Sequence, residues 1–202
     1  MPLPDVLTNL WKRAMLRRIA FSGASRRFGW LYALEDPWGM ATAREQHRFE
    51  SSNAILSRVA PQFDEVLEVG CGEGHQSQYL LRLADQLTGI DISELALERA
   101  RRRCPNAKFL RGGPDEVPNM FPGRQFDLVT ACEVLHYTSD VGASVAALQS
   151  VATRLFVSSY TAPLPAMRYH FEGPGWRTFP PIVYENTRWE IFLWDRSALV
   201  ST

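Results

Sequence analysis

The segment that most constrains the fold is a glycine-rich stretch, EVGCGEGH, at residues 68–75. Its first two residues end a short predicted strand at 66–69, and a segment with helical spacing follows it, so the stretch joins a buried strand to a helix. Glycines let the backbone turn sharply and approach a ligand closely. The spacing G-x-G-x-G differs from the dinucleotide fingerprint G-x-G-x-x-G, and no lysine follows as a Walker loop requires. The stretch therefore predicts ligand contact without a dedicated phosphate cradle.

A second feature of the ligand site follows about twenty residues later, at the distance typical of ribose-binding acids. Asp91 lies at the end of the next predicted strand, 87–92. An acid in this place accepts hydrogen bonds from both hydroxyls of a ribose. Together with the glycine stretch, Asp91 predicts a ligand that contains adenosine.

The rest of the chain alternates between predicted strands and helices, which indicates a parallel sheet covered on both faces. An N-terminal helix opens with a capping box, Thr42 to Glu45, and ends near Pro61. The further strands are expected at 108–110, 126–132 and 154–158, and the further helices at 75–84, 94–104 and 140–152. Neither an internal repeat nor a second domain is apparent.

Composition narrows the class of protein. With 202 residues and 46% hydrophobic residues, the chain suits one globular domain. Its 22 basic and 22 acidic side chains balance, which argues against nucleic acid as a partner. The three cysteines, Cys71, Cys104 and Cys132, neither form a disulfide framework nor show metal-ligand spacing. We expect a cytoplasmic protein, because no signal peptide or membrane-spanning run is recognisable.

The basic residues are concentrated near the N-terminus, where residues 1–30 hold six Lys or Arg side chains and one acid, Asp5. Apolar residues recur there at helical spacing. Such an arm is compatible with contact to a membrane surface or an anionic ligand, and equally with a helix that packs its apolar side on the domain. It also has the composition of an organelle transit peptide.

Three stretches together resemble the class I S-adenosylmethionine (SAM)-dependent methyltransferases: VLEVGCGEG at 66–74, LTGIDIS at 87–93 and FDLVTACEVLHY at 126–137. They extend over roughly half of the chain in the family's order. The resemblance implies a Rossmann-like α/β fold with a seven-stranded, mostly parallel sheet and an antiparallel last strand. Residues 182–185 and 189–193 would then form the C-terminal hairpin.

Within that superfamily the chain looks like the nodulation protein S group. The resemblance lies in Tyr32, Asp36-Pro37-Trp38, Glu45 and Arg48, and in the stretch EVLHY at 133–137. Enzymes of that group N-methylate an amino sugar at the end of a chitin-like oligosaccharide. The resemblance therefore implies a saccharide or other small-molecule acceptor.

The resemblance also assigns residues to the cofactor SAM. They are Glu68, Gly70, Cys71, Gly72, Gly74, Asp91, Ile92, Asp115 and Cys132. Glu68 would organise the loop and reach the methionyl amino group, and Asp91 would bind the ribose hydroxyls. The family usually has an acid that contacts adenine after the third strand. Gly113 occupies that position here, so Asp115 or a backbone carbonyl would take its place.

The candidate catalytic residues follow the strand 126–132: Glu133, His136 and Tyr137. Methyl transfer is an in-line displacement that depends on near-attack geometry, and an amine acceptor must be neutral. His136 is the first candidate for the base or for orienting the acceptor, and the alternative is a structural histidine at a turn. Glu133 is a second candidate, because an acid at the end of an apolar strand needs pairing. No metal is required for an amine acceptor.

Two further segments are candidates for closing over the acceptor. Tyr32 and Trp38 lie in a segment that covers the cofactor cleft in the resembling family. The proline-rich and aromatic stretch 161–181 is a long irregular connection of the kind that often carries function. Its candidates for contact with the acceptor are Arg168, Tyr169 and His170. The alternative for this stretch is a packed cover without acceptor contact.

These features predict an N-terminal helical cap at 1–61 and a SAM-binding core at 62–202, within a single domain. The expected function is a SAM-dependent methyltransferase, with N-methylation ahead of O-methylation, S-adenosylhomocysteine (SAH) as product and no metal. The alternative is a catalytically silent module of the same fold that regulates another enzyme.

Overall fold

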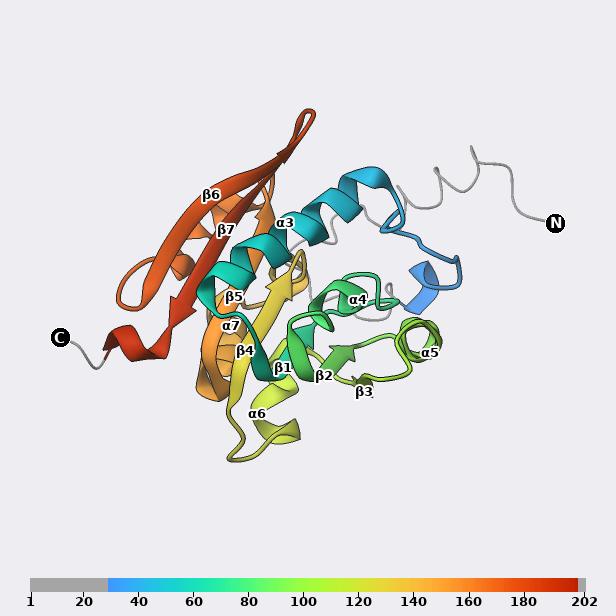
Figure 1. The fold of residues 1–202 in the computed structure, drawn as a ribbon, viewed down its shortest axis with the longest axis horizontal. Coiled ribbons are helices and arrows are strands. Elements are labelled where there is room, and N and C mark those ends of the chain that lie inside the picture. The colour runs from blue at the N-terminus through green and yellow to red at the C-terminus, as the bar shows by residue number, and fades with distance from the viewer. Residues whose placement is uncertain (1–28, 200–202) are drawn as a thin grey trace.

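The computed structural model describes residues 29–199, which form a seven-stranded sheet covered by helices (Figure 1). The predicted basic arm at the N-terminus lies almost entirely outside these residues. The strand order is β3-β2-β1-β4-β5-β7-β6, with β7 antiparallel to both of its neighbours and the other pairs parallel. The strands are β1 (Phe63–Val69), β2 (Ala84–Asp91), β3 (Lys108–Arg111), β4 (Phe126–Cys132), β5 (Ala152–Tyr160), β6 (Trp176–Tyr184) and β7 (Thr187–Asp195). The predicted mostly parallel sheet and its C-terminal hairpin are confirmed.

Helices cover both faces of this sheet. They are α3 (Ala43–Val59), α4 (Ser77–Leu80), α5 (Glu94–Arg103), α6 (Val117–Met120) and α7 (Val141–Val151). On one face, Leu56 of α3 and Leu80 of α4 pack in a cluster with Val66 of β1. On the other, α6 and α7 pack against alternate residues of the same strands, such as Leu67. Because successive side chains of a strand point to opposite faces, the same strands contribute residues to the core on each face of the sheet.

The order of the strands places the candidate site. From β1 the chain moves outward through β2 to β3, and then returns to add β4 and β5 on the other side of β1. The direction of the order therefore reverses between β1 and β4. In open α/β sheets, ligands bind outside the carboxyl ends of the strands at such a switch point. Here that point lies beyond Val69 and Ala131, which are paired in the sheet.

The helix predicted at 75–84 is wrong in its length, because only Ser77–Leu80 is α-helical. The following residues form turns, and β2 already begins at Ala84. The amide of Phe63 donates to the carbonyl of Leu83 at 2.8 Å, so pairing with β1 starts where the helix was expected to continue. Strand pairing therefore limits this helix to little more than one turn.

The predicted capping box is also wrong. Thr42 does occupy the N-cap of α3, but its side chain makes no capping hydrogen bond. The hydroxyl donates instead to the carbonyl of Gly39 at 2.7 Å. Glu45 does not reach back to the N-cap, because its carboxylate accepts from Arg48 Nε at 2.8 Å and Arg44 Nε at 2.9 Å. A buried ion pair thus takes the place of the reciprocal cap.

The irregular connection predicted at 161–181 is shorter than expected. Two short 3-10 helices, Leu164–Ala166 and Arg168–Phe171, lie within it, and β6 already begins at Trp176. Pro180 and Pro181 belong to β6, at a break in the register between Phe179 and Ile182. Because β6 is an edge strand, these prolines do not interrupt a ladder on both sides. None of the helices within residues 29–199 is long and apolar enough to cross a membrane.

Candidate functional site

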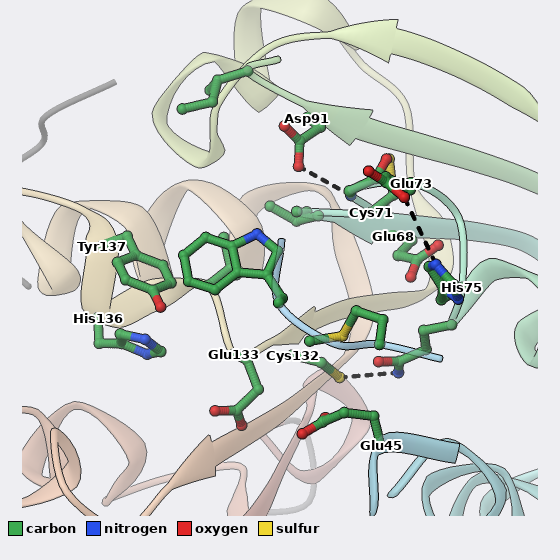
Figure 2. A pocket seen from close by; sticks show the side chains of 18 of the residues that line it. Glu45, Glu68, Cys71, Glu73, His75, Asp91, Cys132, Glu133, His136 and Tyr137 are labelled. Atoms are coloured by element: carbon green, nitrogen blue, oxygen red, sulfur yellow. Dashed lines mark hydrogen bonds and ion pairs between the residues drawn. The ribbon is translucent and has the colours of Figure 1, made fainter. Parts of the chain in front are cut away.

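A cavity of about 510 Å³ opens at the switch point, within the size range of small-molecule sites (Figure 2). Most of the predicted site residues line it: Tyr32, Trp38, Glu68, Gly70, Cys71, Gly72, Asp91, Ile92, Asp115, Cys132, Glu133, His136 and Tyr137. The chain thus brings together residues from the ends of β1, β2 and β4 with residues from the segment before α3. Four predicted residues do not line the cavity: Gly74, Arg168, Tyr169 and His170.

The glycine loop after β1 needs glycine for two reasons. Gly70, Gly72 and Gly74 have φ angles of 73°, 53° and 79°, which L side chains rarely adopt. A Cβ atom on Gly70 would lie 2.6 Å from Val134 Cγ2, and one on Gly72 would lie 2.9 Å from the Tyr32 hydroxyl. A Cβ atom on Gly74 would instead meet the backbone of α5, 3.1 Å from Ala100 Cα. Gly70 and Gly72 thus shape the cavity, whereas Gly74 allows close packing of a helix.

We expect Gly70→Ala to destabilise the protein more than Gly123→Ala does. Gly123 has a similar φ of 71°, but a Cβ atom there would meet nothing within 4 Å. Gly123→Ala therefore carries only the backbone cost of about 1–2 kcal/mol, and Gly70→Ala adds about 1–3 kcal/mol of overpacking. Rotation of Val134 cannot relieve the clash, because its Cβ lies only 2.9 Å from the added atom. Urea unfolding measures the loss in free energy of unfolding for each variant. Equal losses in Gly70→Ala and Gly123→Ala would contradict the steric role of Gly70.

Asp91 is held in place by backbone amides. It is 7% exposed; Oδ2 accepts from the amide of Gly72 at 3.0 Å, and Oδ1 accepts from the amide of Ser93 at 2.9 Å. Burial raises the pKa of Asp91 to about 6, although the amides of Ser93, Gly72 and Ile92 counteract this. Each carboxylate oxygen has a further lone pair for a ligand hydroxyl. The side chain is therefore fixed at the cavity wall and can still accept hydrogen bonds.

Glu68 lies beneath the glycine loop and is 4% exposed. Burial raises the pKa of Glu68 to about 8, although the hydrogen bond from the Ser77 hydroxyl and the charge of Arg48 both lower it. The raised pKa favours the protonated form of this side chain. It can then donate a hydrogen bond as well as accept one.

A buried arginine on α3 is the main site residue to which the sequence reasoning assigned no role. Arg48 is 2% exposed and lines the cavity. Its Nε donates to Glu45 at 2.8 Å, and its Nη1 donates to Gln76 Oε1 at 3.1 Å. Gln76 Nε2 in turn donates to Cys132 Sγ at 3.2 Å. The spacing of Glu45 and Arg48 by three residues, with Phe49 adjacent on the apolar side, is the signal that could have found this pair.

The guanidinium of Arg48 has spare capacity for an anion. It carries five N–H donors. Among residues 29–199, its recorded partners are Glu45, Gln76 and the weakly accepting sulfur of Met40 at 3.8 Å. A buried cation with donors left over, facing a cavity, is a suitable partner for a ligand carboxylate.

Glu133 follows β4 with a positive φ of 59°, which is unusual for a residue other than glycine. Its Oε2 accepts from the amide of Tyr160 at 3.1 Å, and its Oε1 accepts from Ser158 Oγ at 3.4 Å. Burial raises the pKa of Glu133 to about 7, whereas Arg48 and the Tyr160 amide lower it and Glu45 raises it. The strained backbone and the two contacts direct this carboxyl into the cavity. With a pKa of about 7, the carboxyl changes its charge near neutral pH.

His136 and Tyr137 form an aromatic wall beside Glu133 (Figure 2). Their ring centroids are 4.0 Å apart, and the rings of Tyr137 and Trp38 are 5.6 Å apart. Burial lowers the pKa of His136 to about 4, so its imidazole is neutral at pH 7. The Nδ1 atom of His136 finds no hydrogen-bond partner among residues 29–199. His136 can therefore form a hydrogen bond with a bound substrate, but it is a weaker base than Glu133.

The adenine-contacting role of Asp115 stays a prediction. Asp115 lines the cavity, but its Oδ1 already accepts from Ser144 Oγ at 2.5 Å. The next acid, Glu116, is used locally, because its Oε2 accepts from the amide of Gly113 at 2.7 Å. Within the described part of the chain, no group of three or more His, Cys, Asp or Glu side chains could hold a metal ion.

The residues of the 161–181 stretch that were predicted to contact the methyl acceptor, Arg168, Tyr169 and His170, lie outside the cavity. Tyr169 is 66% exposed, and Arg168 forms a loose ion pair with Glu172 at 3.7 Å. His170 packs at the start of α7, where its Cε1 would lie 2.9 Å from a Cβ atom on Gly142. Buried residues of the same stretch, such as Phe171, join the core. Contact of these three residues with an acceptor stays a prediction, and their positions favour the alternative of a packed cover.

Comparison with known sequences finds a methyltransferase domain within the chain. Residues 66–155 match the family model of a methyltransferase domain. The chain is 32% identical over 124 residues to nodulation protein S of Bradyrhizobium diazoefficiens. The aligned residues make up 61% of this chain and 59% of that protein. It is 25% identical to an uncharacterized methyltransferase of Synechocystis, over 87% of this chain and 82% of that protein. The chain thus spans about three fifths of the length of that nodulation protein.

Comparison with solved structures agrees on the fold. The SAH complex of the N-methyltransferase NodS from Bradyrhizobium japonicum superposes with a TM-score of 0.69 at 17% identity, over 88% of this chain and 99% of that one. The N-terminal domain of EvdMO1, crystallised with SAH and D-fucose, superposes with a TM-score of 0.58 at 12% identity, over 73% of this chain and 82% of that one. The matched domain and the strand order agree: residues 66–155 match a methyltransferase domain, the sheet has the fold of the class I SAM-dependent methyltransferases, and the chain is similar to nodulation protein S.

Proposed function

We propose that this protein binds SAM in the cavity and transfers its methyl group to the nitrogen of an amine on a small saccharide. The observation that carries the proposal is the position of Glu133, whose carboxyl lines the cavity and is held there by the Tyr160 amide and the Ser158 hydroxyl, with a pKa that burial raises. An amine that enters as an ammonium must lose a proton before it can attack a methyl group. A carboxylate that titrates near neutral pH suits that task.

The cavity residues fit the proposed cofactor. The glycine loop at Gly70 and Gly72 leaves no room for side chains and lets a ligand approach the backbone. Asp91 would accept the ribose hydroxyls, and Ile92 would pack against the adenine. At the methionyl end, Glu68 and the carbonyl of Cys132 would face the amino group. The unused donors of Arg48 would face the carboxylate.

When bound, SAM supplies an electrophilic methyl group on a sulfonium. The residues of this chain then position the acceptor and receive its proton. Glu133 would accept a proton from the acceptor ammonium first, so that the neutral nitrogen has a lone pair for the new N–C bond; that bond would replace the C–S bond of SAM and leave SAH as the product. His136, neutral and with an unpartnered nitrogen, orients the acceptor by a hydrogen bond. Trp38 and Tyr137 keep water from this end of the cavity.

A cationic saccharide is the acceptor class that these walls suit best. The acceptor end combines the carboxylates of Glu45 and Glu133 with the aromatic rings of Trp38, Tyr137 and Trp189. Carboxylates attract an ammonium, and aromatic faces stack on a sugar ring or shield a cation. The relatives named nodulation protein S and the solved N-methyltransferase NodS support nitrogen as the methylated atom.

A panel of acceptors tests this proposal. The protein is incubated with SAM and with a deacetylated chitin oligosaccharide, its N-acetylated counterpart, a simple amine or a phenol, and products are measured by mass spectrometry. We expect methylation of the free amino sugar and none of its N-acetylated counterpart. Methylation of the phenol or of the acetylated sugar alone would refute N-methylation. Binding of SAH without turnover of any acceptor would favour the catalytically silent alternative.

A further inference from the structure

The segment before α3 forms one wall of the cavity. We call residues 29–42 the cap segment. Five of its residues line the cavity: Tyr32, Asp36, Pro37, Trp38 and Met40. Trp38 Nε1 donates to the Tyr32 hydroxyl at 3.1 Å, and that hydroxyl stands directly over Gly72. The cap segment therefore lies across the glycine loop, where the cofactor would approach the backbone.

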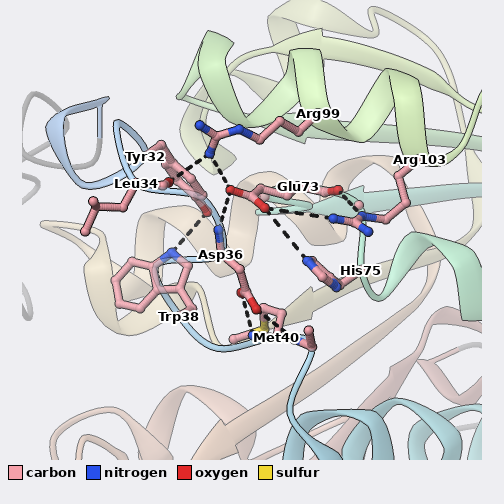
Figure 3. Close-up of polar contacts among 12 residues, drawn as sticks. Tyr32, Leu34, Asp36, Trp38, Met40, Glu73, His75, Arg99 and Arg103 are labelled. Carbon is pink, nitrogen blue, oxygen red and sulfur yellow. Dashed lines mark hydrogen bonds and ion pairs between the residues drawn. The ribbon is translucent and has the colours of Figure 1, made fainter. Parts of the chain in front are cut away.

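One buried carboxylate ties the cap segment to the core (Figure 3). Glu73, in the glycine loop, is 4% exposed. Its Oε1 accepts from the amide of Asp36 at 3.0 Å and from Arg99 Nη1 at 2.6 Å. The same Arg99 nitrogen donates to the carbonyl of Leu34 at 2.8 Å. Two backbone groups of the cap segment are thus bound by one ion pair between the loop and α5.

Other residues hold Glu73 from the core side. Arg103 Nε donates to the Glu73 carbonyl at 2.8 Å, and His75 Nε2 lies 3.8 Å from Oε2. Burial by itself would raise the pKa of Glu73, but the contacts from His75, Arg99 and the Asp36 amide outweigh it and lower the pKa. The carboxylate is therefore ionised at neutral pH, and hydrogen bonds hold its Oε1 on the cap side and the backbone carbonyl of Glu73 on the α5 side. Charge-assisted hydrogen bonds of this kind are among the stronger ones in proteins.

We propose that Glu73 and Arg99 form a latch that positions the cap segment over the SAM site and limits how fast the cofactor binds and leaves. This inference rests on the proposed function, because it assumes that SAM and SAH occupy the cavity. With the latch closed, the Tyr32 hydroxyl lies over Gly72 and narrows the approach to the loop. Opening must break the bonds to the Asp36 amide and the Leu34 carbonyl. Arg99 acts through the cap segment and is a positioning residue.

Arg99 is the better residue to change, because it does not line the cavity, whereas Glu73 does. The variant Arg99→Met removes both of its bonds and keeps a long side chain on α5. Arg102, on the same helix, is exposed and makes no recorded polar contact with residues 29–199. Arg102→Met is therefore the matched control, since it removes one cation from α5 and leaves the latch intact.

Stopped-flow measurement with SAH, followed by tryptophan fluorescence, tests the latch. We expect Arg99→Met to raise both the association and the dissociation rate constants about tenfold, the effect of weakening closure by ~1.4 kcal/mol. The equilibrium Kd then changes less than either rate. A variant that is merely less stable would lose binding capacity and would not bind faster. Rates that match those of the wild type and Arg102→Met would overturn the proposal.

Hydrogen exchange of the cofactor-free protein gives a second readout that does not depend on SAM. Amides at 31–36 should exchange faster in Arg99→Met than in Arg102→Met, while those of β4 stay protected. If Arg99→Met does not fold, Glu73→Gln, which keeps the shape and removes the charge, takes its place in both measurements. Failure of the wild type to bind SAH, together with faster exchange in the variant, would refute the SAM site and leave the latch standing. Unchanged exchange would refute the latch alone.

Discussion

Replacement of Asp91 by alanine is expected to weaken SAH binding by about 100-fold or more, since hydrogen bonds to a charged group contribute ~1.5–3 kcal/mol each. Asp91 is fixed by the amides of Gly72 and Ser93 and lines the cavity. Its loss removes the proposed partner of both ribose hydroxyls. It also leaves the Gly72 amide without its acceptor, so the glycine loop itself is loosened. Isothermal titration calorimetry measures the change in Kd.

The matched control for Asp91 lies on the same strand. Asp85 is an exposed acid of β2 that accepts from Gln62 Nε2 at 2.8 Å and does not line the cavity. Asp85→Ala should bind SAH as the wild type does. If Asp91→Ala keeps wild-type affinity while its fold is intact by circular dichroism, Asp91 is not the ribose partner. The cofactor would then have to lie elsewhere in the cavity.

Replacement of Glu133 by glutamine should lower kcat by about 100- to 10,000-fold, the usual contribution of a general base. Affinity for SAH should stay within about twofold, because the proposed cofactor partners Asp91, Gly72 and Cys132 are unchanged and a factor of two is below ~0.5 kcal/mol. The comparison is made with the amino-sugar acceptor at saturating SAM. A change in kcat without a change in cofactor affinity is the signature of a residue that acts on the acceptor.

The pH dependence of the wild type gives an independent check on Glu133. The carboxyl must be ionised to accept a proton, and its pKa is about 7, so kcat/KM should fall as the pH drops below about 7. Groups that face it are Arg48 and Glu45 of α3, the Tyr160 amide, Ser158 and Tyr137. His136, with a pKa of about 4, adds no step above pH 5. In Glu133→Gln the acidic limb near pH 7 should disappear.

Glu185 provides the control for the Glu133 experiment. Like Glu133 it is a glutamate with a positive φ, 50°, but it is exposed at the turn between β6 and β7 and does not line the cavity. Glu185→Gln should leave both kcat and the pH profile unchanged. Retention of full activity in Glu133→Gln, with the same acidic limb, would assign proton transfer to another group.

The parts of the molecule that the sequence predicted well are those fixed by local pattern. Short, mainly apolar runs at 66–69 and 126–132 mark central strands, because parallel strands buried on both faces are rich in hydrophobic residues. The glycine loop and Asp91 follow strand ends, and the parallel topology brings all such ends to one edge of the sheet. The predicted cofactor residues could therefore be expected to converge, and all but Gly74 line the cavity.

The parts that the sequence did not predict depend on partners that are distant along the chain. Arg48 is buried because Gln76, 28 positions away, and Glu45 satisfy its guanidinium. Glu73 meets Arg99 26 positions later and the amide of Asp36 37 positions earlier. The sequence shows neither which of these charges are buried nor which distant partners hold them. The short α4 has a similar cause, since the early start of β2 is set by pairing with β1.

Composition alone also failed to place one segment of the chain, the one that contains Arg168, Tyr169 and His170. Composition singled out their stretch as irregular and aromatic, but composition does not tell which side of the sheet a connection covers. Buried residues of that stretch, Leu164, Met167 and Phe171, anchor it on the face that carries α7. The aromatic residues that line the cavity include Trp38 and Tyr137, which the sequence singled out, and Trp189, which it did not.

The central claim is that this cavity is a SAM site, and a calorimetric titration of the wild-type protein with SAH tests it most directly. We predict saturable binding of one SAH per chain with a Kd on the order of micromolar, near −8 kcal/mol. ATP and NAD⁺, which carry the same adenosine together with phosphates, should bind much more weakly, because the loop lacks a phosphate cradle. Absence of any binding heat with SAH over a range of temperatures, or equal affinity for NAD⁺, would contradict the account.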